Sequence, residues 1–310
     1  MEVVDQIDGL LRVLWVAALD LLGERLLFVL VVGLSSLLFL PAAWLLAYVD
    51  RHPGNFLHRY KIGKVLGDHE EQEKLLRQAM VNVPLQFSVL YFVLYPIEKV
   101  LLGSASPMLA ALNNRSSTTN LTGLGLSPLS SEFTLLEAPT LCGIVFETAL
   151  QFCLLDTFVY FSHRWMHSNL RLWRYHKHHH RWKTPLVMSA VDVNLVEAMI
   201  VLFGFVGIRV LMQLFFSVHW VSQGLFLTIH TFFSIYAHSG YEFPWLVTTS
   251  SSRHFYHHWR NNGCFGSYTA FWDSVCGTDR EYRRWRGQYD IFQGDFGQTP
   301  QDARLATSQQ

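Results

Sequence analysis

The sequence predicts an all-α, polytopic helical membrane protein that carries a cytoplasmic, histidine-rich metal cap. Half of its 310 residues are hydrophobic and only 15% are charged, which is low for a soluble globular protein. Residues 26–48 contain no charged side chain, and at helical rise they are long enough to cross a bilayer. Twelve of the fifteen histidines fall between His163 and His258, so the enrichment has a local cause.

The N-terminal part of the chain predicts three apolar helices. Residues 10–22, interrupted by Asp20, are expected to form an interfacial helix ahead of the span at 26–48. Residues 79–97 form a second apolar run, which Pro84 and Pro96 would kink or bound.

The loops on either side of the second run differ in charge, and this difference predicts the topology. Residues 50–78 are rich in lysine and arginine, whereas Arg115 is the only basic residue of the loop 103–137. Positively charged loops stay in the cytoplasm, so we expect the first loop there and the second in the lumen. The second loop also holds two N-glycosylation sequons, at Asn114 and Asn120, which are used only on the lumenal side.

A third apolar run, 138–161, is predicted to return the chain to the cytoplasm and to deliver His163 at its end. Its Glu147 and Asp156 are ionisable groups in a membrane segment, which are costly unless paired or functional. Asp156 precedes His163 by two helical turns on the same face, so we expect it to accept a hydrogen bond from a metal-bound histidine. The alternative is a carboxylate that snorkels or pairs with arginine near the interface.

The rest of the chain is predicted to return to the side of the membrane that carries the metal site and then to end in a region of soluble character. Residues 196–235 are largely apolar, with Arg209 and His219 among the exceptions, and fit two short tilted helices or a re-entrant hairpin leading to His238. The predicted organisation is an N-terminal region of spans and lumenal loop (1–137), a catalytic region (138–290) and a disordered tail (291–310).

Three histidine motifs point to a metal site: HRWMH from His163, HKHHH from His176 and HFYHH from His254. On a helix, positions i, i+3 and i+4 share one face, so each motif presents imidazoles together. Eight such imidazoles exceed the four ligands of a structural zinc, and two metal ions fit the count better. Arg164 stands where a zinc peptidase motif has its glutamate, which argues against peptidase chemistry. Spacing alone does not choose between iron, copper, zinc and nickel.

These motifs resemble those of the fatty acid hydroxylase/sterol desaturase superfamily. Further strings agree: RYKI at 59–62, HSGYEFPW at 238–245, and FWD at 271–273 followed by Gly277 and Thr278. The HSGYEFPW string is especially similar to that of sterol 4-methyl oxidases and cholesterol 25-hydroxylases. The chain departs from the sterol oxidase pattern at Asn194, where those relatives commonly carry a histidine shortly before a glutamate.

The resemblance implies a non-haem centre of two irons with nine ligands. They are His163, His167, His176, His179, His180, His238, His254, His257 and His258. His178 falls at a variable position and is expected to be exposed or to lie behind the ligands, and His230 is left out as a core residue.

The activity implied is O₂-dependent hydroxylation of a C–H bond of a sterol or related lipid in the endoplasmic reticulum membrane. Because the sequence has no G-x-G-x-x-G fingerprint, electrons are expected from NAD(P)H through a separate cytochrome b5 and its reductase. Desaturation is the nearest alternative, and a histidine-rich zinc transporter or structural protein is the alternative from another class. The net charge of zero and the lack of a basic binding pattern indicate no nucleic-acid partner.

Overall fold

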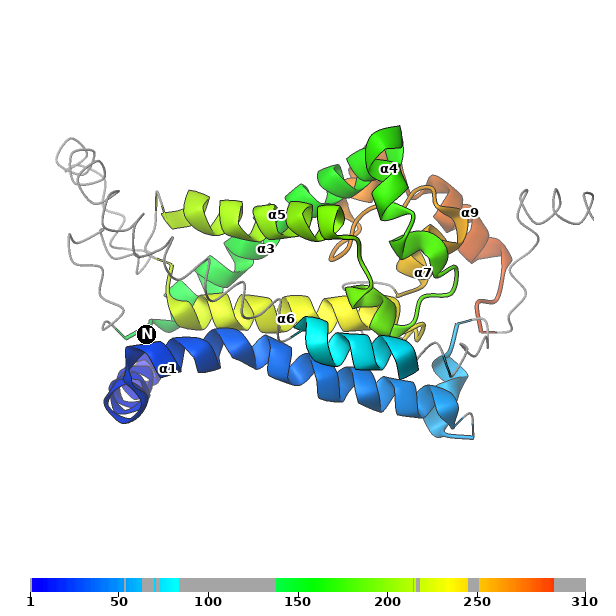
Figure 1. Ribbon diagram of the computed structural model, residues 1–310. Helices are drawn as coiled ribbons and strands as arrows, with labels where there is room; N and C mark the ends of the chain where they lie inside the picture. The colour runs from blue at the N-terminus through cyan, green and yellow to red at the C-terminus, as the bar shows by residue number, and fades with distance from the viewer. Residues whose placement is uncertain are drawn as a thin grey trace, which may run out of the picture. The chain divides into compact units, whose positions relative to one another are not determined.

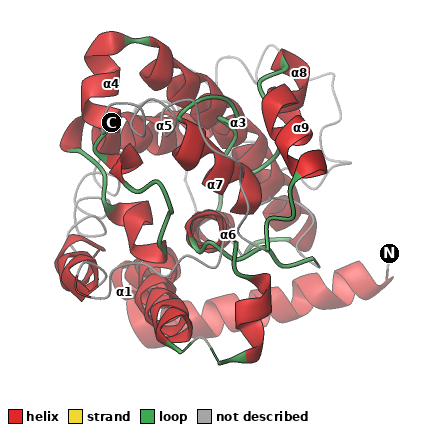
Figure 2. Ribbon diagram, turned by 90° about the vertical axis from the view of Figure 1, so that its right-hand side faces the viewer, coloured by secondary structure: helices red, strands yellow, loops and turns green. Residues whose placement is uncertain are grey.

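The structure is a computed structural model that describes residues 2–52, 54–62, 70, 73–83, 138–213, 215, 218–244 and 251–292. Within these ranges the chain forms α-helices and short 3-10 helices and no β-strand, as Figure 1 and Figure 2 show. The all-α prediction is therefore confirmed for this part of the chain. The predictions for the second half of the run 79–97, for the loop 103–137 with its sequons, and for the tail from residue 293 fall outside the described residues.

The first helix, α1 (Glu2–Arg51), contains both of the N-terminal helices predicted before the first loop. Its backbone leaves the helical conformation at Gly23, with φ 70° and ψ 161°. A residue without Cβ adopts this positive φ without strain. Gly23 thus separates residues 10–22 from residues 26–48, which are helical throughout, as a span requires.

Among the described helices, α3 (Leu141–Ser168) and α5 (Leu195–Gln213) are long and apolar enough to cross a membrane, with mean hydropathies of 1.5 and 2.2. The predicted run 138–161 is therefore a helix, and it continues beyond His163. The region 196–235 forms two helices, because α5 is followed by α6 (Trp220–His238), and this arrangement fits both of the predicted alternatives.

The chain divides into two compact units and passes from one to the other several times. Unit 1 comprises residues 1–38, 82–155 and 201–231, and unit 2 comprises residues 39–81, 156–200 and 232–310. All three histidine motifs and His238 fall in unit 2. The candidate site is therefore built within this unit.

Unit 1 gives the buried Glu147 a partner. The Oε2 atom of Glu147 accepts a hydrogen bond of 2.9 Å from the backbone N–H of His219. The positive charge of Arg209, a buried residue of α5, acts on the same carboxylate. These contacts offset the cost of an ionisable group in an apolar helix.

Unit 2 consists of the ends of the long helices and a set of short ones. The short helices are η1 (Phe56–Tyr60), α4 (Leu170–His176), η3 (His179–Arg181), η4 (Val187–Val191), α7 (Ser251–Arg260), α8 (Phe271–Cys276) and α9 (Arg280–Gln288). A largely aromatic core joins several of them: Ile62, Phe255, Tyr256, Cys264, Tyr282, Trp285 and Ile291. Because Ile291 is fully buried in this core, packed structure continues past residue 290, where the sequence predicted a disordered tail to begin.

A buried polar network explains why the strings at 59–62 and 238–245 occur together. The Nζ atom of Lys61 donates to Oδ1 of Asp50 at 2.8 Å and to the carbonyl of Ser239 at 3.3 Å. The hydroxyl of Tyr241 donates to the same Oδ1 at 2.6 Å. Gly240 between them has a φ of 68°, and a Cβ there would lie 3.2 Å from Nζ of Lys61. The network fixes the chain directly after His238.

Candidate metal centre

The predicted ligands reach one region of unit 2 from five elements. They lie at the end of α3 (His163 and His167), at the end of α4 (His176), in η3 (His179 and His180), at the end of α6 (His238) and on α7 (His254, His257 and His258). The first and third motifs each occupy one helix, as their spacing predicts. The second does not, because α4 ends at His176 and η3 begins at His179. This break directs the histidines of one motif to different places.

The nine histidines form two groups, each with its ligand atoms within 4.8 Å of one another. The first group is His163, His167, His176, His180 and His257. The second group is His179, His238, His254 and His258. The structure therefore brings together every histidine that the resemblance implied as a ligand, and it separates them into two sets.

The Nε2 atoms of the imidazoles face each other within each group. In the first group, Nε2 of His163 lies 3.1 Å from Nε2 of His176, and Nε2 of His257 lies 3.1 Å from Nε2 of His180. In the second group, Nε2 of His254 lies 2.9 Å from that of His238 and 3.0 Å from that of His258. Nitrogen atoms spaced in this way surround a point where a cation bonded at about 2.0–2.1 Å would sit.

Burial keeps these imidazoles neutral. Loss of solvation lowers the pKa of His176 to about 4, of His179 to about 3 and of His238 to about 4. Burial is also the largest cause that lowers the pKa of four others well below the ordinary value: His180, His254, His257 and His258. At neutral pH each of these rings has a free lone pair, which is the form that binds metal.

Carbonyl groups fix the tautomer of four of the imidazoles. The Nδ1 atoms of His163 and His257 donate to the carbonyls of Phe265 (2.9 Å) and Gly263 (2.7 Å). Those of His258 and His238 donate to the carbonyls of Trp182 and Ser234, both at 2.9 Å. A ring that carries its proton on Nδ1 presents the lone pair of Nε2 toward the group, so the donor set fits a metal.

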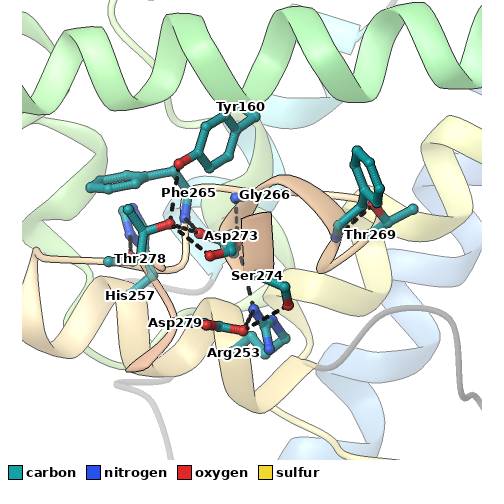
Figure 3. A network of polar contacts seen from close by, with 12 residues as sticks. Tyr160, Arg253, His257, Phe265, Gly266, Thr269, Asp273, Ser274, Thr278 and Asp279 are labelled. Atoms are coloured by element: carbon teal, nitrogen blue, oxygen red, sulfur yellow. Dashed lines mark hydrogen bonds and ion pairs between the residues drawn. The ribbon is translucent and has the colours of Figure 1, made fainter. Parts of the chain in front are cut away.

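Asp273 holds the loop that supplies two of these carbonyls, as Figure 3 shows. Its buried carboxylate accepts from the backbone N–H groups of Phe265 and Gly266, both at 2.9 Å, and from the hydroxyl of Thr278 at 2.6 Å. Phe265 in turn accepts from His163. The FWD string at 271–273 therefore positions ligands of the first group indirectly, and the sequence alone did not show this.

Among the described residues, the carboxylate next to a predicted ligand histidine is that of Glu197. Its Oε1 lies 3.0 Å from Nδ1 of His176, and both side chains are buried. Sequence reasoning missed this residue, although the departure at Asn194 drew attention to the segment. Asn194 accepts from the backbone N–H of Val196 at 3.0 Å and begins α5, which carries Glu197 in its first turn.

Asp156 does not take the position that the sequence predicted for it. Its two carboxylate oxygens accept from the backbone N–H (3.1 Å) and the hydroxyl (2.6 Å) of Thr269. Two turns separate Asp156 from His163, about 10 Å along the axis, which is too far for a direct hydrogen bond.

The two remaining histidines of interest stay outside both groups. His178 is exposed, and its Nε2 lies 3.1 Å from Oδ1 of Asp192. His230 is in unit 1, where its ring contacts Phe205 with centroids 4.8 Å apart. Both placements agree with the expectation that neither is a ligand.

Comparison with known proteins identifies the region that carries this site. The model of the fatty acid hydroxylase family matches residues 148–278, a range that includes both histidine groups. The predicted resemblance is confirmed. The matched range also contains Asp156, Glu197 and Asp273.

The curated relatives that this chain matches act on sterols according to their names. The chain is 29% identical over 158 residues to a C-4 methylsterol oxidase of Schizosaccharomyces pombe, covering 48% of this chain and 52% of the relative. It is 32% identical over 148 residues to a methylsterol monooxygenase of Aspergillus fumigatus, covering 46% and 50%. A cholesterol 25-hydroxylase-like protein of Danio rerio is 27% identical over 158 residues, covering 47% and 55%.

The chain spans about half the length of the curated relatives it matches. No solved structure matches it.

Proposed function

We propose that this protein is a membrane non-haem di-iron monooxygenase that hydroxylates a C–H bond of a sterol or related lipid. The observation that carries the proposal is the separation of nine neutral imidazoles into two adjacent groups with converging Nε2 atoms. Two groups of five and four nitrogens match two metal ions better than one structural ion. The family match and the sterol-oxidising names of the relatives support iron and oxygen chemistry.

The two groups would each hold one iron, with His163, His167, His176, His180 and His257 at one and His179, His238, His254 and His258 at the other. Bound iron supplies the activation of O₂ that insertion of oxygen into an unactivated C–H bond requires. The protein fixes ring orientation through the Nδ1 contacts and excludes water by burying the site. For each substrate hydroxylated, one O₂, two electrons and two protons are consumed and one water is released.

The substrate and partners follow from the resemblance and the relatives. Methylsterol is the substrate in the names of several relatives, so a sterol or a related lipid is proposed here. We propose that electrons come from NAD(P)H through cytochrome b5 and its reductase, in the endoplasmic reticulum membrane. Exposed basic side chains follow the first motif and offer a surface for an acidic donor: Arg171, Arg174, Lys177, Arg181 and Lys183.

Lipid profiling with isotopic oxygen tests the function. Cells that express the protein, or its His257→Ala variant as control, are grown under ¹⁸O₂ and their sterols and other lipids are compared by mass spectrometry. A hydroxylated lipid that gains one ¹⁸O only with the unchanged protein supports the proposal. A product that has lost two hydrogens and carries no ¹⁸O would instead identify a desaturase.

Metal analysis separates the oxygenase from a zinc protein. The protein is purified in detergent from iron-replete cells, and its metals are measured before and after iron reconstitution. Two irons per chain with O₂-dependent turnover support the proposal. Tightly bound zinc that persists, with no turnover after reconstitution, would favour a zinc transporter or structural protein.

A further inference from the structure

Glu197 is the carboxylate that, among the described residues, contacts a member of the two histidine groups. Its Oε1 lies 3.0 Å from Nδ1 of His176, and the two side chains are 7% and 2% exposed. The residue stands in the first turn of α5, where the partial positive charge of the helix N-terminus favours an anion. Glu197 is therefore a buried carboxylate directly behind a predicted ligand of the first group.

The charge of the same carboxylate also acts on the second group, at His179. Its other oxygen, Oε2, is buried and makes no hydrogen bond to a described residue. The Nδ1 atom of His179 is also buried and also makes no hydrogen bond to a described residue. The rings of His179 and His176 have centroids 5.7 Å apart. Burial lowers the pKa of His179 to about 3, and the charge of Glu197 is the strongest charge that opposes this lowering.

The positive charge of the proposed metal centre makes the position of the Glu197 carboxylate important. All nine ligands are neutral imidazoles, so two divalent ions would place four positive charges in a buried region. A buried charge without an opposite charge is costly. The outer nitrogens of His163, His238, His257 and His258 donate to neutral carbonyls, which bring no negative charge. Among the described residues, Glu197 is the anion in contact with a ligand.

We propose that Glu197 is a positioning residue shared by the two metal sites. Its carboxylate lies 3.0 Å from Nδ1 of His176 and stabilises positive charge at His176 and His179, so it strengthens metal binding in both groups without binding metal itself. A carboxylate behind a ligating imidazole fixes the ring and raises its basicity. The proposal rests on the metal centre of the proposed function.

The test is Co²⁺ binding to the full-length protein in detergent, compared with the Glu197→Gln variant. Co²⁺ reports its ligand environment in the visible spectrum, and its affinity is measured by titration against a competing chelator. We expect two ions in the unchanged protein and an affinity about 10- to 100-fold weaker at both sites in the variant. The visible spectrum of the first site should also shift, because His176 becomes a weaker ligand.

Two further variants make the result specific. Glu147→Gln is the matched control, because it neutralises a carboxylate that is as buried as Glu197 and that has no described contact with a member of either group. It should leave both Co²⁺ affinities unchanged. Glu197→Asp keeps the charge but withdraws it by one methylene, so its affinities should lie between those of the unchanged protein and Glu197→Gln. The Glu197→Asp variant also tests the proposal if Glu197→Gln does not fold.

The possible outcomes are distinguishable. Two Co²⁺ ions bound with unchanged affinity in the Glu197 variants would overturn the positioning role and leave the metal centre standing. Weakening at one site alone would overturn the shared role, and equal weakening by Glu147→Gln would show a general cost of neutralising a buried carboxylate. Absence of Co²⁺ binding by the unchanged protein would overturn the metal centre and the inference together.

Discussion

At the scale of single residues, the second histidine motif provides an internal comparison. His176 and His180 are buried members of the first group, whereas His178, between them, is exposed and contacts Asp192. Removing one imidazole leaves a metal short of a ligand. We therefore expect His176→Ala, His180→Ala or His257→Ala to abolish turnover while the protein still inserts into the membrane.

His178→Ala is the control for these variants, because it removes an imidazole from the same motif without removing a predicted ligand. It should retain most of the activity. Turnover and iron per mole of purified variant are the measurements. A His178→Ala variant as inactive as its neighbours would require a different ligand set.

The second residue-scale prediction concerns Asp156. Its carboxylate accepts two hydrogen bonds from Thr269, so Asp156→Asn places an amide N–H₂ group against donors. An unsatisfied buried donor costs about 1–3 kcal/mol. The variant should have a lower melting temperature and a normal iron content per folded molecule. Loss of iron with unchanged stability would instead support the role predicted from the sequence, in which Asp156 accepts a hydrogen bond from a metal-bound histidine.

The contrast between Asp156 and Glu197 shows what the sequence could and could not predict at this scale. Ligand histidines were predictable because their spacings of three and four residues are a property of one helix. The carboxylate behind His176 comes from the start of another helix, and no local spacing connects residue 197 to residue 176. His238 was predictable only through the family resemblance.

At the scale of elements, the loop 263–266 depends on α8. Asp273, near the start of α8, accepts hydrogen bonds from two backbone amides of this loop. Two carbonyl groups of the same loop accept hydrogen bonds from Nδ1 of His163 and of His257. We expect Asp273→Ala to release the loop, so that the amides of Phe265 and Gly266 exchange hydrogen faster. Metal affinity should fall at the first group and be retained at the second.

Hydrogen exchange measured by mass spectrometry, together with Co²⁺ titration, checks this prediction. Thr278→Val is the milder comparison, because it removes one of the hydrogen bonds to Asp273 and leaves both amide contacts. Unchanged exchange at 265 and 266 in Asp273→Ala would contradict the role given to Asp273.

The helix boundaries of the structure agree with those predicted from the sequence where an apolar run is continuous, and they differ from the prediction in the second histidine motif. The runs 138–161 and 196–235 predicted α3, α5 and α6, because long apolar stretches form helices in either a membrane or a core. The second motif has helical spacing, but α4 stops within it. A turn at residues 177 and 178 separates α4 from η3, and the spacing of the histidines alone does not predict where such a turn occurs.

At the scale of the whole molecule, topology is the main prediction. From the charge asymmetry of residues 50–78 and 103–137 we predict that the histidines lie in the cytoplasm and the second loop in the lumen. In sealed microsomes, protease should therefore cleave a tag inserted after residue 292 and spare one inserted in the loop 103–137.

Glycosylation gives an independent measurement of the same topology. Use of either sequon should produce a mobility shift that a glycosidase removes and that the double variant Asn114→Gln, Asn120→Gln lacks. Cleavage of both tags from the cytoplasmic side would contradict the arrangement.

The distribution of the ligands along the chain makes the proposed centre a cross-link. The first group joins α3 to α7 through His163 and His257, and the sequence between them is long. A covalent link that closes a loop of roughly a hundred residues removes about 4 to 5 kcal/mol of chain entropy from the unfolded state. A metal that holds both ends acts on the unfolded chain in the same way. The loaded protein should thus resist proteolysis between α4 and α6, and a strong chelator should make that stretch the first to be cut.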